Sequence, residues 1–364
     1  MKAAVLRETN KPLSIEEVEL DPPKVNEVKV KIAAAGVCRS DLHFMKGEAA
    51  IAVPAVLGHE GSAIVTEIGE GVTRVAPGDH VILSFVPFCG HCRSCLSGHA
   101  NLCDTHTATG PSMFDGTKRL HVGTEYLSHM GKVACFAEEA IVPENGCAKV
   151  DPSLSLAAAA LIGCSVTTGV GSVLFNAKIE PGSAVAVIGC GGVGLNILQG
   201  ARVAGATKII AIDVSDAALE FAGRFGATHT INGRQADVVK RVKELTDGAG
   251  ADYAFESFGS SETVTTAFDS VRKGGTAVIV GLSALGDLAQ IDPVALVRQE
   301  KTLKGAYYGS SRPAIDFYRM VDLYQSGQID VDGLVTRTYT LDQINEAYEE
   351  LDRGVVGRGI IAFQ

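Results

Sequence analysis

The sequence lacks the basic character of proteins that bind nucleic acids or anionic membranes. Its 32 lysine and arginine residues are outnumbered by 42 aspartate and glutamate residues, which gives a formal net charge of -10. No run of basic side chains concentrates positive charge locally. A chain with this balance has no general attraction to phosphate groups. We therefore expect neither nucleic acid nor a membrane as a partner.

The chain also lacks the pattern of an export signal. Its first residues, MKAAVLRETNK, contain an apolar run that is too short for a signal-peptide core. We therefore expect a cytoplasmic protein in which the nine cysteines stay reduced and form no disulfides. Metal binding is then the leading explanation for so many thiols.

Charged side chains are absent from residues 152–177, a segment long enough to span a bilayer. Small polar residues and glycines interrupt it too often for a lipid-facing helix, namely Ser153, Ser155, Gly163, Ser165, Thr167, Thr168, Gly169 and Gly171. We interpret the segment as a buried crossing between two domains.

Length and composition predict a two-domain globular protein. A chain of 364 residues exceeds what one hydrophobic core usually supports. A hydrophobic fraction of 46%, a charged fraction of 20% and 41 glycines are typical of an α/β protein with many tight turns. The first third contains short β-rich segments broken by glycine and proline, at residues 28–37, 62–72 and 76–83. It predicts an irregular β domain.

From about residue 183 the pattern changes to strand, glycine turn, helix, strand and helix. This order predicts a βαβ unit in a parallel sheet covered by helices, a doubly wound Rossmann domain. We place the Rossmann domain at residues 166–306. The β-rich domain then comprises residues 1–165 and 307–364, since the sequence finishes on a strand-like GIIAF.

A cysteine-rich loop reads FCGHCRSCLSGHANLC and contains Cys89, Cys92, Cys95 and Cys103. Four thiolates at these spacings can enclose one zinc ion, which then has no open coordination position and serves a structural role. An iron–sulfur cluster is the alternative, but the Cys-Pro that continues the ferredoxin pattern is absent. His91 and His99 lie within the loop, and we expect both to be exposed bystanders.

Other candidate ligands are scattered along the chain. GVCRSDLH ends a strand, VLGHEG follows an apolar run, and LIGCSVTTG stands where the β domain passes into the βαβ unit. A single cysteine on an apolar segment is usually a core residue. Individually these motifs are weak. The residues of interest in them are Cys38, Ser40, Asp41, His43, His59, Glu60 and Cys164.

The glycine turn VAVIGCGGVGLN predicts a dinucleotide site, because it follows an apolar strand and precedes a helix. Gly189 permits the tight turn, Gly191 lets the backbone approach a pyrophosphate, and Gly194 allows close helix packing. Asp213 ends the next strand, where a carboxylate accepts ribose hydroxyls and repels a 2′-phosphate. Since Val214 offers no compensating charge, NAD is favoured over NADP.

Together these motifs resemble the medium-chain zinc-dependent alcohol dehydrogenases, and the resemblance covers essentially the whole chain. It implies a GroES-like catalytic domain beside the Rossmann domain. It also implies that Cys38, His59 and Cys164 hold a catalytic zinc whose fourth position takes water or the substrate oxygen. With the cysteine loop, two zinc ions per chain are expected. Relatives are dimers or tetramers, so a homodimer or homotetramer is expected too.

The resemblance further assigns roles to individual residues. Glu60 lies just behind the metal, and Asp41 orients the imidazole of His59. Ser40 and, beyond the cofactor ribose, His43 carry the substrate proton to solvent. The cofactor set consists of Arg39, Gly189, Gly191, Gly192, Val193, Gly194, Asp213 and Arg358, with the two arginines on the pyrophosphate. Phe85 matches a wall of the substrate pocket.

Two positions depart from the family pattern. Ala63 stands where relatives usually carry glycine, and it would be strained if the backbone there required a positive φ. Ala218 replaces a basic residue commonly found five positions after the ribose-binding aspartate, so NAD is expected to bind more weakly.

These residues predict reversible oxidation of an alcohol to an aldehyde or ketone, with hydride transfer to NAD. A thiol-adduct-dependent formaldehyde dehydrogenase is an alternative, because the cysteine loop and the C-terminus are broadly similar to that class III branch. The acidic and basic anchors of that branch are not evident around Ala49 and Thr107. A non-catalytic zinc- and nucleotide-binding protein is a further alternative.

Overall fold

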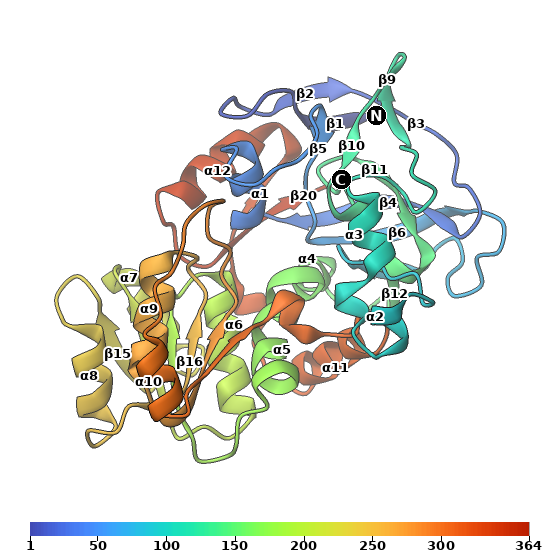
Figure 1. Ribbon diagram of the computed structural model, residues 1–364. Helices are drawn as coiled ribbons and strands as arrows, with labels where there is room; N and C mark the ends of the chain where they lie inside the picture. The colour runs from blue at the N-terminus through green and yellow to red at the C-terminus, as the bar shows by residue number, and fades with distance from the viewer. Residues whose placement is uncertain (364) are drawn as a thin grey trace. The chain divides into compact units, whose positions relative to one another are not determined.

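The computed structural model describes residues 1–363 and divides into two compact units (Figure 1). The β-rich unit contains Met1–Cys164, Arg312–Asp322 and the chain from Val331 onward. The α/β unit contains Ser165–Ser311 and Leu323–Asp330. Residue 364, the last of the predicted catalytic domain, lies outside the described residues.

The β-rich unit is built from three sheets. Its largest sheet has the strand order β12-β7-β6-β4-β20-β19, with β11 also paired to β4. A four-stranded sheet has the order β10-β5-β1-β2, and a small sheet the order β3-β8-β9. The strands are β1 (Lys2–Leu6), β2 (Ser14–Glu17), β3 (Glu19–Leu20), β4 (Glu27–Gly36), β5 (Ala55–Val56), β6 (Gly61–Ile68), β7 (His80–Leu83), β8 (Leu120–Val122), β9 (Glu125–Tyr126), β10 (Ser128–His129), β11 (Glu139–Pro143), β12 (Cys147–Val150), β19 (Val335–Tyr339) and β20 (Arg358–Ala362).

Strand β4 organises the largest sheet. In its first half Val28, Val30 and Ile32 are buried and alternate with lysines, the period of two expected of a half-buried strand. One edge pairs with β6, while the other pairs first with β11 and then with β20. Strand β20, near the C-terminus, is thereby joined to this sheet beside Gly36, the first residue of the motif GVCRSDLH.

Short helices connect these strands. They are α1 (Arg39–Met45), α2 (Arg93–Leu96), α3 (Asp104–Thr109), α4 (Leu156–Leu161) and α12 (Ile344–Asp352), and α11 (Pro313–Gln325) begins in this unit.

Most of the charge-free segment, Leu156–Ala177, forms one continuous helix. It runs from α4 through a π-helical segment at Ile162–Val166, α5 (Thr167–Gly171) and a second π-helical segment at Ser172–Ala177. The helix is long and apolar enough to cross a membrane, but 83% of its most apolar 18-residue window is buried inside the molecule. Burial in the protein core therefore accounts for its composition.

The α/β unit is a doubly wound sheet, as the sequence predicts. Its six strands are all parallel, in the order β15-β14-β13-β16-β17-β18. The strand order reverses between β13 and β16, which is where this fold binds ligands. The strands are β13 (Ala184–Ile188), β14 (Lys208–Asp213), β15 (His229–Asn232), β16 (Ala251–Glu256), β17 (Val271–Ile279) and β18 (Thr302–Gly305). Helices flank them (Figure 1), namely α6 (Gly192–Val203), α7 (Asp216–Gly223), α8 (Val238–Leu245), α9 (Ser261–Ser270) and α10 (Pro293–Arg298).

Candidate metal centres and cofactor site

Three predicted ligands, distant in sequence, meet in the β-rich unit. Cys38 precedes α1, His59 lies between β5 and β6, and Cys164 lies in the first π-helical segment. Their ligating atoms all lie within 4.8 Å of one another, and all three residues are buried. The Cys164 Sγ and His59 Nε2 atoms are 3.3 Å apart. A tetrahedral zinc ion places sulfur and nitrogen ligands about 3.6 Å apart, so this donor set fits zinc with one position left open.

Gly163 explains how Cys164 reaches this site. A Cβ atom at Gly163 would lie 2.7 Å from the carbonyl oxygen of Leu83 in β7. Only glycine lets the helix pack this closely against the sheet. The π-helical turn adds one residue to the helical repeat there, a distortion that is frequent at functional sites.

Asp41 orients the imidazole of His59 through the ring nitrogen that does not face the other two ligands. The carboxylate is fully buried, and its Oδ1 atom lies 3.2 Å from His59 Nδ1 while accepting the backbone N–H of Gly58 at 2.9 Å. This contact leaves Nε2 for the metal. Burial opposes a positive charge on His59, but Asp41 and Cys38 outweigh it and raise the pKa of the imidazole well above its ordinary value.

A buried ion pair lies beside the three ligands. Arg358 donates from Nη2 to Glu60 Oε2, and both side chains are almost completely buried. Gly36 makes room for the carboxylate, since a Cβ atom there would collide with it. Hydrogen bonding with Cys164, followed by the charges of Arg358 and His59, lowers the pKa of Cys38 against the effect of burial. Cys164, Arg358 and His59 together thus favour a thiolate at Cys38.

The structure therefore gives Arg358 a contact that the sequence did not predict. Its guanidinium donates to Glu60, whereas the family resemblance implies a place on the cofactor pyrophosphate. That second role stays a prediction. Arg39 is exposed at the first residue of α1, and its pyrophosphate role also stays a prediction.

Helix α1 carries the two predicted proton-relay residues. Ser40 and His43 are three residues apart and so share one face of the helix. The Cys38 Sγ atom lies 3.8 Å from Ser40 Oγ, which places Ser40 beside the three-ligand site. His43 Nδ1 lies 2.6 Å from Glu48 Oε2. Sequence reasoning missed Glu48, although Gly47 before it is a signal of a helix end.

Phe85 also lies beside the three-ligand site. Its half-buried ring meets His59 edge-on, with ring centroids 5.1 Å apart and an interplanar angle of 86°. Its predicted place on the wall of a substrate pocket is compatible with this contact.

The four cysteines of the loop form a second cluster in the same unit. Their sulfur atoms lie within 4.8 Å of one another, with Cys89 to Cys95 and Cys92 to Cys103 both at 4.0 Å. A single tetrahedral zinc ion holds thiolates about 3.8 Å apart, so the loop fits one ion with four protein ligands. His91 and His99 are exposed.

The glycine turn of the α/β unit has the conformation that its sequence predicts. Gly189 has a φ of 92°, which favours glycine. A Cβ atom at Gly191 would meet nothing within 4 Å, so the backbone is open to an approaching group. A Cβ atom at Gly194 would collide with the carbonyl oxygen of Gly189. Gly192 and Val193 open helix α6 directly after this turn.

Asp213 lies at the end of β14 and connects the turn to the next loop. Its carboxylate accepts the backbone N–H of Cys190 at 2.8 Å and those of Val214 and Ser215 at 2.7 and 3.0 Å. The cap of α7 is Ser215, whose Oγ accepts the N–H of Ala218. Asp213 is therefore not needed as a helix cap.

Ala63 does not strain the loop that carries His59. It lies inside β6, fully buried, and pairs with Ile32 and Val81. Extended backbone suits alanine as well as glycine, so the possible strain considered from the sequence does not arise.

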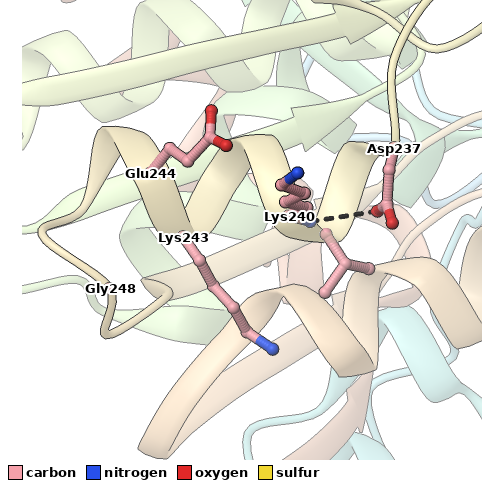
Figure 2. Close-up of a pocket in the computed structure, with 6 residues that line it drawn as sticks. Asp237, Lys240, Lys243, Glu244 and Gly248 are labelled. Carbon is pink, nitrogen blue, oxygen red and sulfur yellow. Dashed lines mark hydrogen bonds between the residues drawn. The ribbon is translucent and has the colours of Figure 1, made fainter.

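One surface hollow lies outside all of these sites. It lies along α8 (Figure 2). Its volume is about 380 Å³. None of its lining residues belongs to the predicted sites, and Asp237 is occupied in capping α8 through the N–H of Lys240. Its lining consists of Asp237, Val239, Lys240, Lys243, Glu244 and Gly248.

Comparison with known proteins places the chain in a family. Residues 24–152 match the alcohol dehydrogenase GroES-like domain, and residues 192–326 match the zinc-binding dehydrogenase domain. The NDMA-dependent alcohol dehydrogenase of Amycolatopsis methanolica is 41% identical over 99% of this chain and 98% of that protein.

Solved structures agree with these sequence matches. Benzyl alcohol dehydrogenase of Acinetobacter calcoaceticus superposes with a TM-score of 0.95 at 34% identity, over 100% of this chain and 99% of that one. A protein of Sinorhizobium meliloti 1021 bound to NADP superposes at 0.82 and 27% identity, over 100% and 99%. The predicted fold class is confirmed, with a GroES-like and a Rossmann domain. The chain belongs to the medium-chain zinc-dependent alcohol dehydrogenase family.

Proposed function

We propose that this protein oxidises an alcohol reversibly to an aldehyde or ketone, with zinc held by Cys38, His59 and Cys164. The observation that carries the proposal is this buried set of two thiols and one imidazole, whose geometry fits zinc with one position left for substrate. The names of its relatives, which include a benzyl alcohol dehydrogenase, support an alcohol as the substrate.

When bound, the zinc polarises the substrate oxygen and the nicotinamide cofactor exchanges hydride with the substrate carbon. The protein's own residues supply the rest. Asp41 fixes the direction of His59. The Ser40 hydroxyl, beside Cys38, accepts the substrate proton while passing its own proton through the cofactor ribose hydroxyl toward His43. His43 releases that proton to solvent, for which its 15% exposed side chain is suited.

We propose NAD as the nicotinamide cofactor. Asp213 and Val214 support this choice, because a carboxylate disfavours a 2′-phosphate and valine offers no cation to neutralise one. The names of two similar proteins are a reason to test NADP and NDMA as well. One solved neighbour is bound to NADP, and the Amycolatopsis relative is NDMA-dependent. The four-cysteine loop is proposed to hold a second, structural zinc ion.

We also propose a cytoplasmic homodimer or homotetramer. Strand β18 supports self-association, because its four residues are exposed and it pairs only with β17 among the described strands. An unpaired edge of this kind can pair with the same edge of a second copy.

Two alternatives are kept because a single assay separates them. A thiol-adduct-dependent formaldehyde dehydrogenase requires anchors for the adduct, and Ala49 and Thr107 supply no charge. A non-catalytic zinc- and nucleotide-binding protein would keep both sites without turnover.

The test is an NADH absorbance assay on protein whose zinc content has been measured. A panel of aliphatic and aromatic alcohols and aldehydes is assayed with NAD or NADP, with and without glutathione, and with and without added NDMA. Two zinc ions per chain and thiol-independent turnover with NAD support the proposal. Turnover that requires glutathione supports the formaldehyde dehydrogenase, and turnover only with NADP or only with NDMA overturns the cofactor assignment. Zinc and NAD binding without turnover supports the non-catalytic protein.

A further inference from the structure

Helix α1 ends in a turn that determines where Glu48 lies. Gly47 follows the helix with a φ of 70°, and its N–H donates to the carbonyl oxygen of Phe44 at 3.1 Å. The N–H of Glu48 donates to the carbonyl oxygen of His43 at 2.8 Å. These two hydrogen bonds and the left-handed glycine define a Schellman motif. The motif brings Glu48 back beside His43, five residues earlier in the chain.

The side chains of these two residues also meet. Glu48 Oε2 lies 2.6 Å from His43 Nδ1, a short contact of the charge-assisted kind. An ionised carboxylate only accepts hydrogen bonds, so the hydrogen must lie on Nδ1. In the neutral ring this arrangement leaves the lone pair on Nε2. The contact therefore selects the Nδ1–H tautomer of His43.

We propose that Glu48 is a positioning residue for the proton outlet, which is a role that rests on the proposed function. In that function the Ser40 hydroxyl accepts the substrate proton while passing its own proton to the cofactor ribose hydroxyl. His43 accepts the relayed proton on Nε2 and then releases it from Nε2 to solvent. Glu48 neither gains nor loses a proton. It keeps Nε2 in the accepting form and stabilises the imidazolium that forms when the proton arrives.

Without Glu48, the ring would return to the Nε2–H tautomer that an unconstrained histidine prefers. Nε2 would then be a donor and unable to accept the relayed proton. Removing Glu48 should therefore slow proton transfer and leave zinc binding unchanged. Among the described residues, the side chain of Glu48 contacts His43 and is not part of either ligand set.

A neighbouring ion pair supplies a matched control. Lys46, the C-cap of α1, pairs with Asp352 at 2.7 Å. Asp352 has a side-chain exposure of 43%, close to the 40% of Glu48. Asp352→Asn therefore removes a carboxylate of similar exposure from the same end of the helix without touching His43.

The experiment combines nitrogen NMR with kinetics on the full chain. Long-range ¹⁵N–¹H correlation spectra in alkaline buffer report the tautomer of His43, whose signal is assigned by its loss in His43→Gln. We expect the Nδ1–H tautomer in the wild type and in Asp352→Asn, and the Nε2–H tautomer in Glu48→Ala. Glu48→Gln keeps an acceptor oxygen and should keep the Nδ1–H tautomer.

The value of kcat for alcohol oxidation should follow the tautomer of His43 in these variants. In Glu48→Ala, kcat for alcohol oxidation should fall about tenfold, less than the roughly hundredfold that loss of a general base costs. Glu48→Gln should lie between Glu48→Ala and the wild type, and Asp352→Asn should stay within about twofold of the wild type. Zinc content should be unchanged in all three.

Two failures are distinguishable. If the wild type turns over alcohol but shows the Nε2–H tautomer, or if Glu48→Ala changes neither the tautomer nor kcat, this inference alone is overturned. If the wild type shows no turnover with any alcohol or cofactor, the proposed function is overturned, whatever tautomer His43 adopts.

Discussion

The carboxylate of Glu60 and the guanidinium of Arg358 form a buried ion pair beside Cys38 and Cys164. The two residues are 298 positions apart in the sequence, and strand pairing between β20 and β4 brings them together. Burial opposes the charge of Arg358, but Glu60 raises the pKa of the guanidinium above its ordinary value. Each charge is therefore tolerated in the core because the other is present.

Breaking this pair from one side should be costly. Arg358→Gln leaves the Glu60 charge buried without its partner, and we expect the free energy of unfolding to fall by about 3 to 5 kcal/mol. The double variant Glu60→Gln with Arg358→Gln should recover part of that loss, because two amides can hydrogen-bond without a buried charge. Urea unfolding of the wild type and of these two variants measures both values. A double variant less stable than Arg358→Gln would contradict the coupling.

Cys164→Ala tests the three-ligand site. Removing one of three protein ligands should reduce the zinc content from two ions per chain to one and abolish alcohol oxidation, since the remaining Cys38 and His59 hold zinc weakly. Metal analysis and the NADH assay measure the two effects. Cys147→Ala is the control, because Cys147 is also buried but belongs to neither cluster. It should keep both ions, and full activity in Cys164→Ala would refute the site.

The four-cysteine loop should contribute stability and not chemistry. Cys103 is a predicted zinc ligand, and its sulfur also accepts the backbone N–H of His106 at the start of α3. Cys103→Ala should therefore remove one zinc ion and lower the free energy of unfolding by more than about 4 kcal/mol, because the binding energy of a structural zinc is folding energy. The surviving ion should remain on Cys38, His59 and Cys164. An unchanged midpoint of urea unfolding would show that the loop is not a structural metal site.

Much of this architecture is predictable from the sequence because local patterns carry it. The doubly wound order follows from alternating apolar strands and helices. In the turn at residues 189–194, the positive φ of Gly189 and the close packing at Gly194 exclude larger residues. The family motifs also point to Cys38, His59 and Cys164, which the structure brings within 4.8 Å.

Three features were not predicted from the sequence, namely the Glu60–Arg358 ion pair, the π-helical turn at Cys164 and the role of Glu48. The first two depend on contacts between distant segments, and the third depends on how a helix ends. Nothing in the residues around Glu60 names Arg358 as its partner, because a charge alone does not specify which opposite charge it will meet. The π-helical turn at Cys164 depends on packing against β7, which sequence periodicity does not report. Glu48 is different, because the glycine before it signals the turn that brings it to His43.

Asp213 should control the choice between NAD and NADP. Asp213→Asn keeps a polar side chain but removes the negative charge that disfavours a 2′-phosphate. We expect the ratio of kcat/KM for NAD to that for NADP to fall about tenfold, equivalent to about 1.4 kcal/mol. Steady-state kinetics with each cofactor measure this ratio. Because Asp213 also accepts the N–H of Cys190, the unfolding midpoint is measured in parallel. An unchanged ratio in a stable variant would exclude Asp213 from cofactor discrimination.

His129 should make the protein sensitive to acid. Its buried ring accepts the backbone N–H groups of Arg119 and Leu120 at Nε2, and burial together with nearby cations lowers its pKa to about 3. Below about pH 6.5 the imidazole of His129 binds a proton in the unfolded chain but not in the folded chain. The contribution of His129 to the free energy of unfolding is therefore fully present above that pH. It should decline by up to about 1.4 kcal/mol per pH unit as the pH falls toward 3.

His129→Gln removes the titrating group, although it costs some stability at every pH because the side chain is buried. The slope of unfolding free energy between pH 6 and 4.5 should therefore be shallower in His129→Gln than in the wild type, by about one proton. The exposed His91 provides the control, and His91→Gln should keep the wild-type slope. Since the test compares slopes and not absolute stabilities, the packing cost of the substitution does not affect it. Equal slopes in all three proteins would show that His129 is protonated equally in the folded and unfolded chains.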